Sequence, residues 1–224
     1  MKYKDNLHRY RKYIADIIKQ EEGDILYYYE PFCGRCHVGI VISADNKFFS
    51  DIHAPIVALF QKILMNWIPP VFIGRNIVSY AFSRPDDFAP HFNGFVGHTF
   101  TQDGSYYGHT VHYPRFKTEG QHAYRSLMRD MKQCGETTGI QFTFQVADAF
   151  EINYIDNAVI FCHPPQDNSF DYGKFWRWIE TLKYNTRIYV ALNSNRSVPI
   201  DYEKHWKLDT PLVYPVIYKI GRIG

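Results

Sequence analysis

The chain has 224 residues and a formal net charge of +2, with 46% hydrophobic and 21% charged residues. This composition excludes a disordered chain, and the length suffices for one sizeable α/β domain with a small inserted region. No apolar run is long enough to span a bilayer, and four scattered cysteines are too few for a disulfide framework. We therefore expect no membrane partner and a location in the cytoplasm or another reducing compartment, while the charge leaves a nucleic-acid partner open.

Helix and strand patterns alternate along the first 70 residues. Apolar residues with a helical period predict helices over 4–20 and 54–67, and runs of β-forming residues predict strands over 25–29 and 47–51. Pro69-Pro70 ends the second helix.

The pattern weakens between residues 71 and 117, where Gly, Pro, His, Asn and Ser are frequent. This stretch is predicted to be an irregular insertion with few regular elements. Periodicity then returns, and the predicted elements are a helix over 120–133, strands over 140–146 and 158–162, a helix over 174–182, a strand over 187–192, and an alternating segment over 212–220 that pairs at a sheet edge. The alternation of strands and helices predicts a three-layer α/β sheet.

A rigid turn follows the buried strand that ends near Cys162. Its residues are His163, Pro164, Pro165 and Gln166, and each proline fixes φ and removes an N–H donor. In open α/β sheets, ligands bind at the carboxyl ends of strands. We therefore expect the turns over 30–35, 50–53 and 163–166 to converge on one crevice.

Asp51 ends the second predicted strand, shortly after the turn that contains Gly34. In nucleotide-binding sheets, an acid at this position accepts hydrogen bonds from ribose hydroxyls. Alternatively, Asp51 caps the helix over 54–67, because Asp is also a strong N-cap.

The segment from Cys33 to His37 has the pattern Cys-x-x-Cys-His. This pattern attaches c-type haem, and its two cysteines also form half of a zinc site. The alternative is two ordinary thiols in a buried turn, since short patterns of this kind match by chance.

The order of these features resembles that of the Dam-like adenine DNA methyltransferases, especially the compact versions carried by phages and other viruses. The segments that carry the resemblance are Met1–Leu7, Tyr28–Arg35, Asp51-Ile52-His53, Gly94–Gly97, Asp148, His163–Gln166 and Phe175–Trp178. They are collinear with the family's motifs and extend over nearly the whole chain.

The resemblance implies a three-layer, Rossmann-like class I S-adenosylmethionine-dependent methyltransferase fold over 1–70 and 118–224. It implies that 71–117 is an inserted region of the target-recognition type. The implied remnants of the cofactor site are Tyr3, Glu30, Phe32, Gly34, Asp51 and Asp148, and the implied catalytic turn is His163-Pro164-Pro165-Gln166.

The chain departs from the family's pattern mainly where the chemistry lies. The departures are Asp5 and Arg35 in place of Gly, Leu7 in place of the Lys that meets the cofactor carboxylate, His163 in place of Asp, and Gln166 in place of an aromatic residue. In the family, the acid and the first Pro carbonyl accept hydrogen bonds from the target amino group. A neutral imidazole supplies no negative charge there, and loss of one positioned electrostatic group costs about 3 kcal/mol. We expect little or no methyl transfer, and no cofactor or only weak binding of S-adenosylmethionine.

The sequence therefore predicts a catalytically inactive relative that binds DNA or another nucleic acid, or that serves as a scaffold for protein partners in a viral or multi-subunit assembly. Two alternatives stay open. One is an active adenine DNA methyltransferase with an atypical motif, and the other is a metal- or haem-binding protein that uses Cys33, Cys36 and His37.

Overall fold

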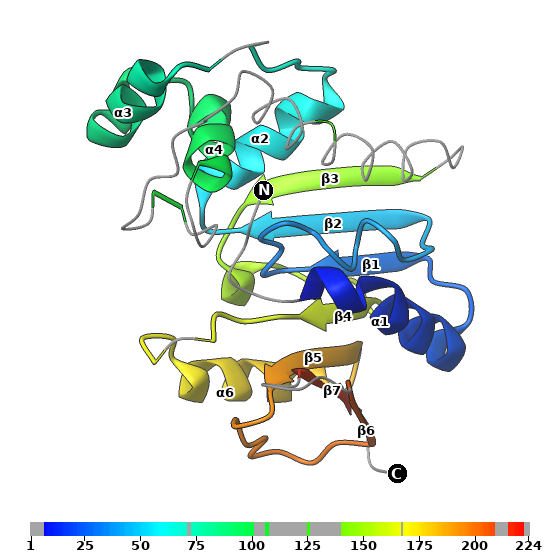
Figure 1. Ribbon diagram of the computed structural model, residues 1–224. Coiled ribbons are helices and arrows are strands. Elements are labelled where there is room, and N and C mark those ends of the chain that lie inside the picture. The colour runs from blue at the N-terminus through cyan, green and yellow to red at the C-terminus, as the bar shows by residue number, and fades with distance from the viewer. Residues whose placement is uncertain are drawn as a thin grey trace. The chain divides into compact units, whose positions relative to one another are not determined.

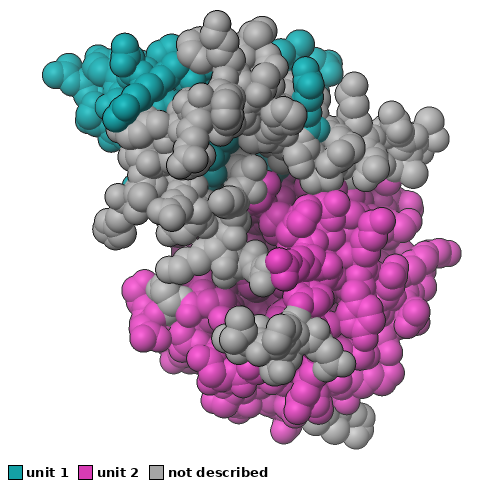
Figure 2. Space-filling view, viewed as in Figure 1, with its two compact units in different colours: residues 1–6, 53–138 teal, residues 7–52, 139–224 magenta. Residues whose placement is uncertain are grey.

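The computed structural model describes residues 7–70, 73–100, 106–107, 125, 140–166, 168–208 and 215–221. The chain forms two compact units, one of residues 1–6 and 53–138 and the other of residues 7–52 and 139–224 (Figure 2). Tyr3 and Asp5 lie outside the described residues, and so does the helix expected over 120–133 except for Arg125.

The larger unit is built on a seven-stranded sheet with the order β3-β2-β1-β4-β5-β7-β6 (Figure 1). The strands are β1 (Tyr27–Glu30), β2 (Asn46–Asp51), β3 (Gln141–Val146), β4 (Val159–Cys162), β5 (Arg187–Asn193), β6 (Lys204–Lys207) and β7 (Pro215–Ile220). Strands β3, β2, β1, β4 and β5 are parallel, and β7 runs antiparallel to both β5 and β6. This is the doubly wound Rossmann order with a reversed strand inserted between the last two.

Two helices cover opposite faces of this sheet. Helix α6 (Tyr172–Leu182) packs its buried aromatic side chains against Ile188 and Val190 of β5 in one apolar cluster. The neighbouring residue Tyr189 points the other way, and its hydroxyl donates a hydrogen bond to Glu22 of helix α1 (Leu7–Glu22). Since successive side chains of a strand alternate between faces, α1 and α6 lie on opposite sides. The predicted three-layer α/β sheet is confirmed.

The connection from β1 to β2 contains short turns in place of a long crossover helix. Its apolar residues Val38, Ile40 and Ile42 are buried. A Cβ added to Gly39 would lie 2.1 Å from Cε1 of Phe49, so only glycine lets this segment pack so closely on β2.

The smaller unit contains helices, although weak periodicity led us to expect an irregular stretch from 71 onward. Its elements are α2 (Ala54–Leu64), α3 (Arg75–Ser83), the short 3₁₀ helix η1 (Pro85–Asp87) and α4 (Pro90–Thr99). The expectation was wrong because Pro85 and Pro90 occupy first-turn positions, where proline starts a helix. Gly94 is a packing residue, since a Cβ there would lie 2.1 Å from the carbonyl oxygen of Pro55 at the start of α2.

The C-terminal part of the sheet also differs from the expectation of an edge strand over 212–220. Strand β7 lies inside the sheet, and the edge is β6, which was not predicted. Three of the four β6 residues, Lys204, His205 and Lys207, are polar, so its hydrophobic signal is weak. No helix of the described part is both long and apolar enough to cross a membrane.

Candidate active site

The turn after β1 is joined to the end of β2 by two hydrogen bonds. The Gly34 N–H donates to Oδ2 of Asp51 at 3.0 Å, and the Cys33 N–H donates to the Ser50 carbonyl at 3.0 Å. Strand β1 pairs with β2 on one side and with β4 on the other, in parallel. The carboxyl ends of these three strands therefore lie along one edge of the sheet, which is where the sequence placed the site.

The structure tests one of the two interpretations of Asp51, namely that it is the N-cap of the helix expected over 54–67. Helix α2 has His53 rather than Asp51 as its N-cap residue, and the His53 side chain forms no capping hydrogen bond. The Asp51 carboxylate instead accepts the Gly34 N–H within the larger unit. Its expected contact with a ribose stays a prediction.

Glu30 is buried beneath the turn, with only 3% of its surface exposed. Its Oε2 accepts hydrogen bonds from the Tyr28 hydroxyl at 3.1 Å and from the Gly39 N–H at 2.8 Å. Burial raises the pKa of this carboxyl to about 8, although these hydrogen bonds and the positive charge of Lys47 oppose the rise. At neutral pH the side chain is thus largely protonated and holds the turn together.

Lys47 is buried on the same face of the sheet as Glu30. It is the partner of Tyr28 in the register of β1 and β2. Its Nζ donates hydrogen bonds to the carbonyl oxygens of Gly39 at 3.0 Å and of Ile42 at 2.5 Å. These bonds satisfy a cation that would otherwise be costly to bury. Two buried side chains, the acid Glu30 and the base Lys47, therefore hold the segment between β1 and β2 in place.

The thiols of Cys33 and Cys36 are buried and free. Burial raises the pKa of both thiols, which disfavours their thiolate forms. Among the described residues, no group of three or more His, Cys, Asp or Glu side chains is arranged to hold a metal ion.

Asp148 follows β3 and caps the short 3₁₀ helix η2 (Ala149–Glu151) by accepting the Phe150 N–H at 3.0 Å. The Nζ of Lys174, on α6, lies 3.6 Å from Oδ2 of Asp148 and 4.1 Å from the centre of the Phe150 ring. The carboxylate expected near the cofactor adenine is therefore already paired with a cation.

Phe32 belongs to an aromatic group on the α6 side of the sheet. Its ring meets those of Phe150, Phe170, Phe175 and Trp178 edge-on, at centroid separations of 5.7–6.3 Å. Such edge-to-face contacts add to the free energy of packing beyond the burial of area. In this structure Phe32 fastens the turn to α6, and its contact with a cofactor stays a prediction.

The turn after β4 is held by the side chain of Gln166. Its Nε2 donates to the Pro164 carbonyl at 2.6 Å, and its Oε1 accepts the Asn193 N–H at the end of β5, at 3.1 Å. His163 and Gln166 are half-buried, whereas Pro164 is buried. The amide therefore connects the β4 turn to the next strand.

Residues that the sequence did not single out support this turn. Arg196 donates to the Gln166 carbonyl at 3.0 Å and to Asn168 at 3.1 Å, and its guanidinium lies 4.7 Å from the centre of the Tyr172 ring. The Tyr172 hydroxyl donates to the Pro165 carbonyl at 2.9 Å. One signal was available for Asn193, because it is a polar residue at the end of an apolar strand next to β4.

No protein-family model matches the chain, and no curated protein matches it in sequence. Among solved structures, it is similar to the rRNA methyltransferase aviRa from Streptomyces viridochromogenes, with 12% identity, a TM-score of 0.52, and coverage of 95% of this chain and 84% of the other. It is also similar to HI0767 from Haemophilus influenzae, a proposed methylase, with 12% identity, a TM-score of 0.46, and coverage of 96% and 98%.

The strand order and the first of these similarities agree. The fold is that of the class I S-adenosylmethionine-dependent methyltransferases. At this level of identity the likeness establishes the methyltransferase fold alone, so activity must be argued from the residues.

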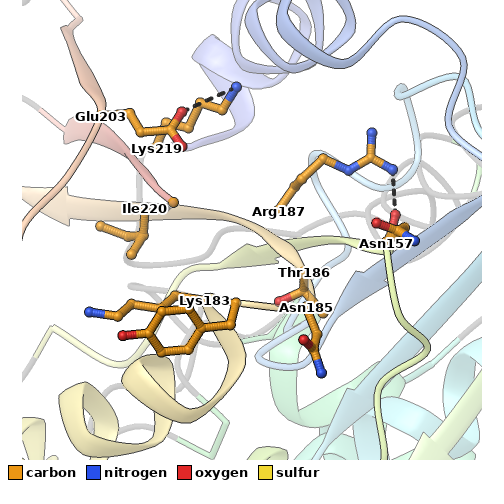
Figure 3. A pocket seen from close by; sticks show the side chains of 10 residues that line it. Asn157, Lys183, Asn185, Thr186, Arg187, Glu203, Lys219 and Ile220 are labelled. Atoms are coloured by element: carbon orange, nitrogen blue, oxygen red, sulfur yellow. Dashed lines mark hydrogen bonds and ion pairs between the residues drawn. The ribbon is translucent and has the colours of Figure 1, made fainter. Parts of the chain in front are cut away.

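A pocket of about 200 Å³ lies at the opposite edge of the sheet, where β5 begins and β7 ends (Figure 3). Its cations are already paired. Arg187 donates to the Asn157 carbonyl and pairs with Glu22, and Lys219 lies 3.6 Å from Glu203 and 3.0 Å from Glu22. Because the pocket lies where β5 begins, it is remote from the turns after β1 and β4, which carry the candidate site.

Proposed function

We propose that this protein is a non-catalytic relative of the Dam-like adenine DNA methyltransferases that binds nucleic acid. The observation that carries the proposal is the hydrogen bond from Gln166 Nε2 to the Pro164 carbonyl. By the resemblance, that carbonyl is one of two acceptors that hold the target amino group, and the other acceptor is an acid where this chain has His163. An incoming amino group would have to share the carbonyl with the Gln166 amide.

The residues around the expected cofactor support the same conclusion. Leu7 is 4% exposed and offers no charge to the cofactor carboxylate, and Lys174 pairs with the acid expected near the adenine. Arg35 places a long side chain where the family has glycine. These residues do not fit a cofactor held as in the active family, so we derive no methyl-transfer step through it.

Two features support nucleic acid as the partner. The fold is shared with an enzyme that acts on rRNA, and the resemblance is to enzymes that act on DNA. Basic residues also stand after the carboxyl end of β1, where Arg35 and His37 follow the strand and the rings of His8 and His37 lie 5.2 Å apart, centre to centre. Service as a scaffold for protein partners in a viral or multi-subunit assembly remains part of the proposal, with the cytoplasm or another reducing compartment as its location.

The decisive experiment is a methyl-transfer assay with labelled S-adenosylmethionine and adenine-containing DNA or RNA, run beside calorimetry with the cofactor and anisotropy with the same nucleic acids. We expect no transfer and weak or absent cofactor binding. We also expect nucleic-acid binding that weakens as salt rises, because phosphate contacts release counterions. Catalytic turnover would overturn the claim of inactivity, and failure to bind either nucleic acid would overturn the claim of a nucleic-acid partner.

The second candidate is an active methyltransferase with an atypical motif. It is favoured by Asp51, which lies at the carboxyl end of β2, and by Asp148, which follows β3. The same transfer assay separates the two candidates. As a further comparison, the double variant His163→Asp with Gln166→Tyr is expected to stay inactive, because Leu7 and Arg35 remain.

A further inference from the structure

The cysteines of the Cys-x-x-Cys segment stand at the two ends of one tight turn. The Cys36 N–H donates to the Cys33 carbonyl at 2.5 Å, which closes the turn over Gly34 and Arg35. In such a turn the first and fourth Cα atoms lie less than about 7 Å apart, and the Cα atoms of bridged cysteines are usually about 4.4–6.8 Å apart. The backbone therefore brings the two cysteines within bridging distance.

Both thiols lie on the same side of this turn. Cys33 and Cys36 are buried, whereas Gly34 and Arg35 between them are only half-buried. Both thiols are free in this structure. Since a disulfide also requires that the two side chains do not point apart, their common burial beneath the turn meets this requirement.

Hydrogen bonds to other parts of the larger unit hold both ends of the turn. The Cys33 N–H donates to the Ser50 carbonyl at 3.0 Å, and the Ile40 N–H donates to the Cys36 carbonyl at 2.9 Å. Between them, the Gly34 N–H donates to Asp51 at 3.0 Å. The separation of the two cysteines is therefore fixed before any bridge forms.

Cys36 has an uncommon backbone conformation. Its φ is 53°, in the left-handed region that side chains other than Asn and Asp rarely adopt. Glycine adopts this conformation without the steric cost, and residues held in it cluster at functional sites. The thiol of Cys36 thus stands at a position where glycine would be less costly, and a role in chemistry accounts for it.

The two thiols differ in their readiness to react. Burial raises the pKa of both, but the hydrogen bond between them lowers the pKa of Cys33 and raises that of Cys36 further. The thiolate is the attacking species in disulfide exchange. Cys33 is therefore the cysteine that reacts first, and Cys36 is the one that completes the bridge.

We propose that Cys33 and Cys36 are a redox site, which forms a reversible intrachain disulfide by exchange with a low-molecular-weight disulfide such as glutathione disulfide. The Cys33 sulfur attacks one sulfur of glutathione disulfide, so that a mixed disulfide forms, the glutathione S–S bond breaks, and one glutathione leaves with the Cys33 proton. The Cys36 sulfur then attacks the Cys33 sulfur, and the second glutathione leaves with the Cys36 proton. Two protein thiols are oxidised, and one glutathione disulfide is reduced to two thiols.

The bridge locks the turn after β1, which carries the Gly34 N–H that bonds Asp51. A covalent ring around Gly34 and Arg35 restricts local opening of the turn, so amide hydrogen exchange at Gly34 is slower in the oxidised form. In a reducing compartment such disulfides are transient and respond to the redox state. Oxidation therefore changes the mobility of one of the two turns at the carboxyl edge of the sheet.

The test is equilibration of the full chain in glutathione buffers of increasing oxidised fraction. One sample starts as reduced native protein, and the other is refolded from urea in the same buffers, where the thiols are accessible before the turn forms. After an acid quench, the remaining thiols are alkylated in denaturant and assigned by peptide mass mapping. We expect Cys33 and Cys36 to lose alkylation together from both starting points and to regain it in excess reduced glutathione.

Variants separate the roles of the two thiols. Cys36→Ala is expected to stop the reaction at a mixed disulfide of Cys33 with glutathione, whereas Cys33→Ala should give less of the corresponding adduct, because the pKa of Cys36 is raised further. Cys162→Ala is the matched control, since it removes an equally buried thiol from the end of β4 and should leave the bridge intact.

The redox site is overturned if Cys33 and Cys36 remain alkylatable from both starting points even where nearly all the glutathione is oxidised, or if Cys162→Ala abolishes the bridge. Hydrogen exchange at Gly34 that is equally fast in the oxidised and reduced wild-type proteins would overturn the locking of the turn. The alkylation and exchange measurements on wild type are decisive even if a variant does not fold.

Discussion

The turns after β1 and after β4 lie at the same edge of one sheet, yet they relate to the family pattern in opposite ways. At the first turn, Glu30 at the end of β1 and Asp51 at the end of β2 match the pattern, and each accepts a backbone N–H group, from Gly39 and Gly34 respectively. In the second turn, Gln166 breaks the pattern, and its amide forms two hydrogen bonds that hold the turn.

This difference separates the identity of a residue from its role. Glu30 agrees with the resemblance but is buried under its own turn, where it cannot reach a ligand without rearrangement. Gln166 disagrees with the resemblance, but its side chain forms two hydrogen bonds at this edge. A residue that matches a motif therefore does not by itself have the function of that motif. A residue that departs from the motif can have a structural role of its own.

The largest effect is expected at Glu30. Its pKa is about 8 in the folded protein against 4.5 in the unfolded chain, so the unfolded chain loses its proton first. The stabilisation from the protonated carboxyl is complete below pH 4.5 and is lost as the pH rises through 8. Glu30→Gln keeps the neutral form, so its stability relative to wild type should rise by on the order of 5 kcal/mol between these pH values.

Urea unfolding at several pH values between 4.5 and 8 checks this expectation. Glu151→Gln serves as the control, because Glu151 is exposed on the short helix η2. Parallel pH profiles for wild type and Glu30→Gln would contradict a protonated Glu30.

A smaller effect is expected at Gln166. Gln166→Leu removes the donor to Pro164 and the acceptor for Asn193 and should lower the free energy of unfolding by about 1–3 kcal/mol. Gln166→Glu keeps an acceptor for the Asn193 N–H but loses the donor, so it should fall between wild type and the leucine variant. Equal unfolding curves for all three proteins would show that the amide does not hold the β4 turn.

The smallest effect on stability is expected at Lys174. The ion pair with Asp148 is 3.6 Å long and its side chains are 49% and 35% exposed, so Lys174→Gln should cost less than about 1 kcal/mol. If the pair blocks the expected adenine position, the same change should raise the affinity for S-adenosylhomocysteine in calorimetry. Lys183→Gln is the matched control, because Lys183 also pairs with an acid, Glu180, and lies near the ring of Tyr184. An equal change in affinity for S-adenosylhomocysteine in both variants would show that Lys174 does not specifically block the adenine position.

The sequence predicted the sheet well because its central strands are continuous apolar runs, which is typical of strands buried on both faces. The sequence-based prediction failed at α4 and β6, where features other than hydrophobic periodicity determine the structure. The prolines and glycines of α4 indicated irregular backbone, but Pro90 starts the helix and Gly94 packs against Pro55. Strand β6 is short and polar and is defined by its pairing with β7.

The site shows the same limit. The positions of Asp51 and His163 followed from where strands end, because the carboxyl ends of parallel strands share one edge, whereas Asp148 was implied only by the family resemblance. The direction of each side chain did not follow, since burial of Glu30 and the bond from Gln166 to Pro164 depend on contacts distant in sequence or on backbone geometry. Neither the buried Nε2 of His37 nor its approach to His8 could be read from the Cys-x-x-Cys-His pattern.

The position of β7 between β5 and β6 has a consequence for synthesis of the chain. Both neighbours of β7 leave the ribosome before it does, and they cannot pair in the native way until it arrives. During that interval the apolar strand β5 has one row of unpaired N–H and C=O groups, the kind of edge on which chains aggregate. Insertion of β7 is therefore the step that joins β6 to the rest of the described sheet.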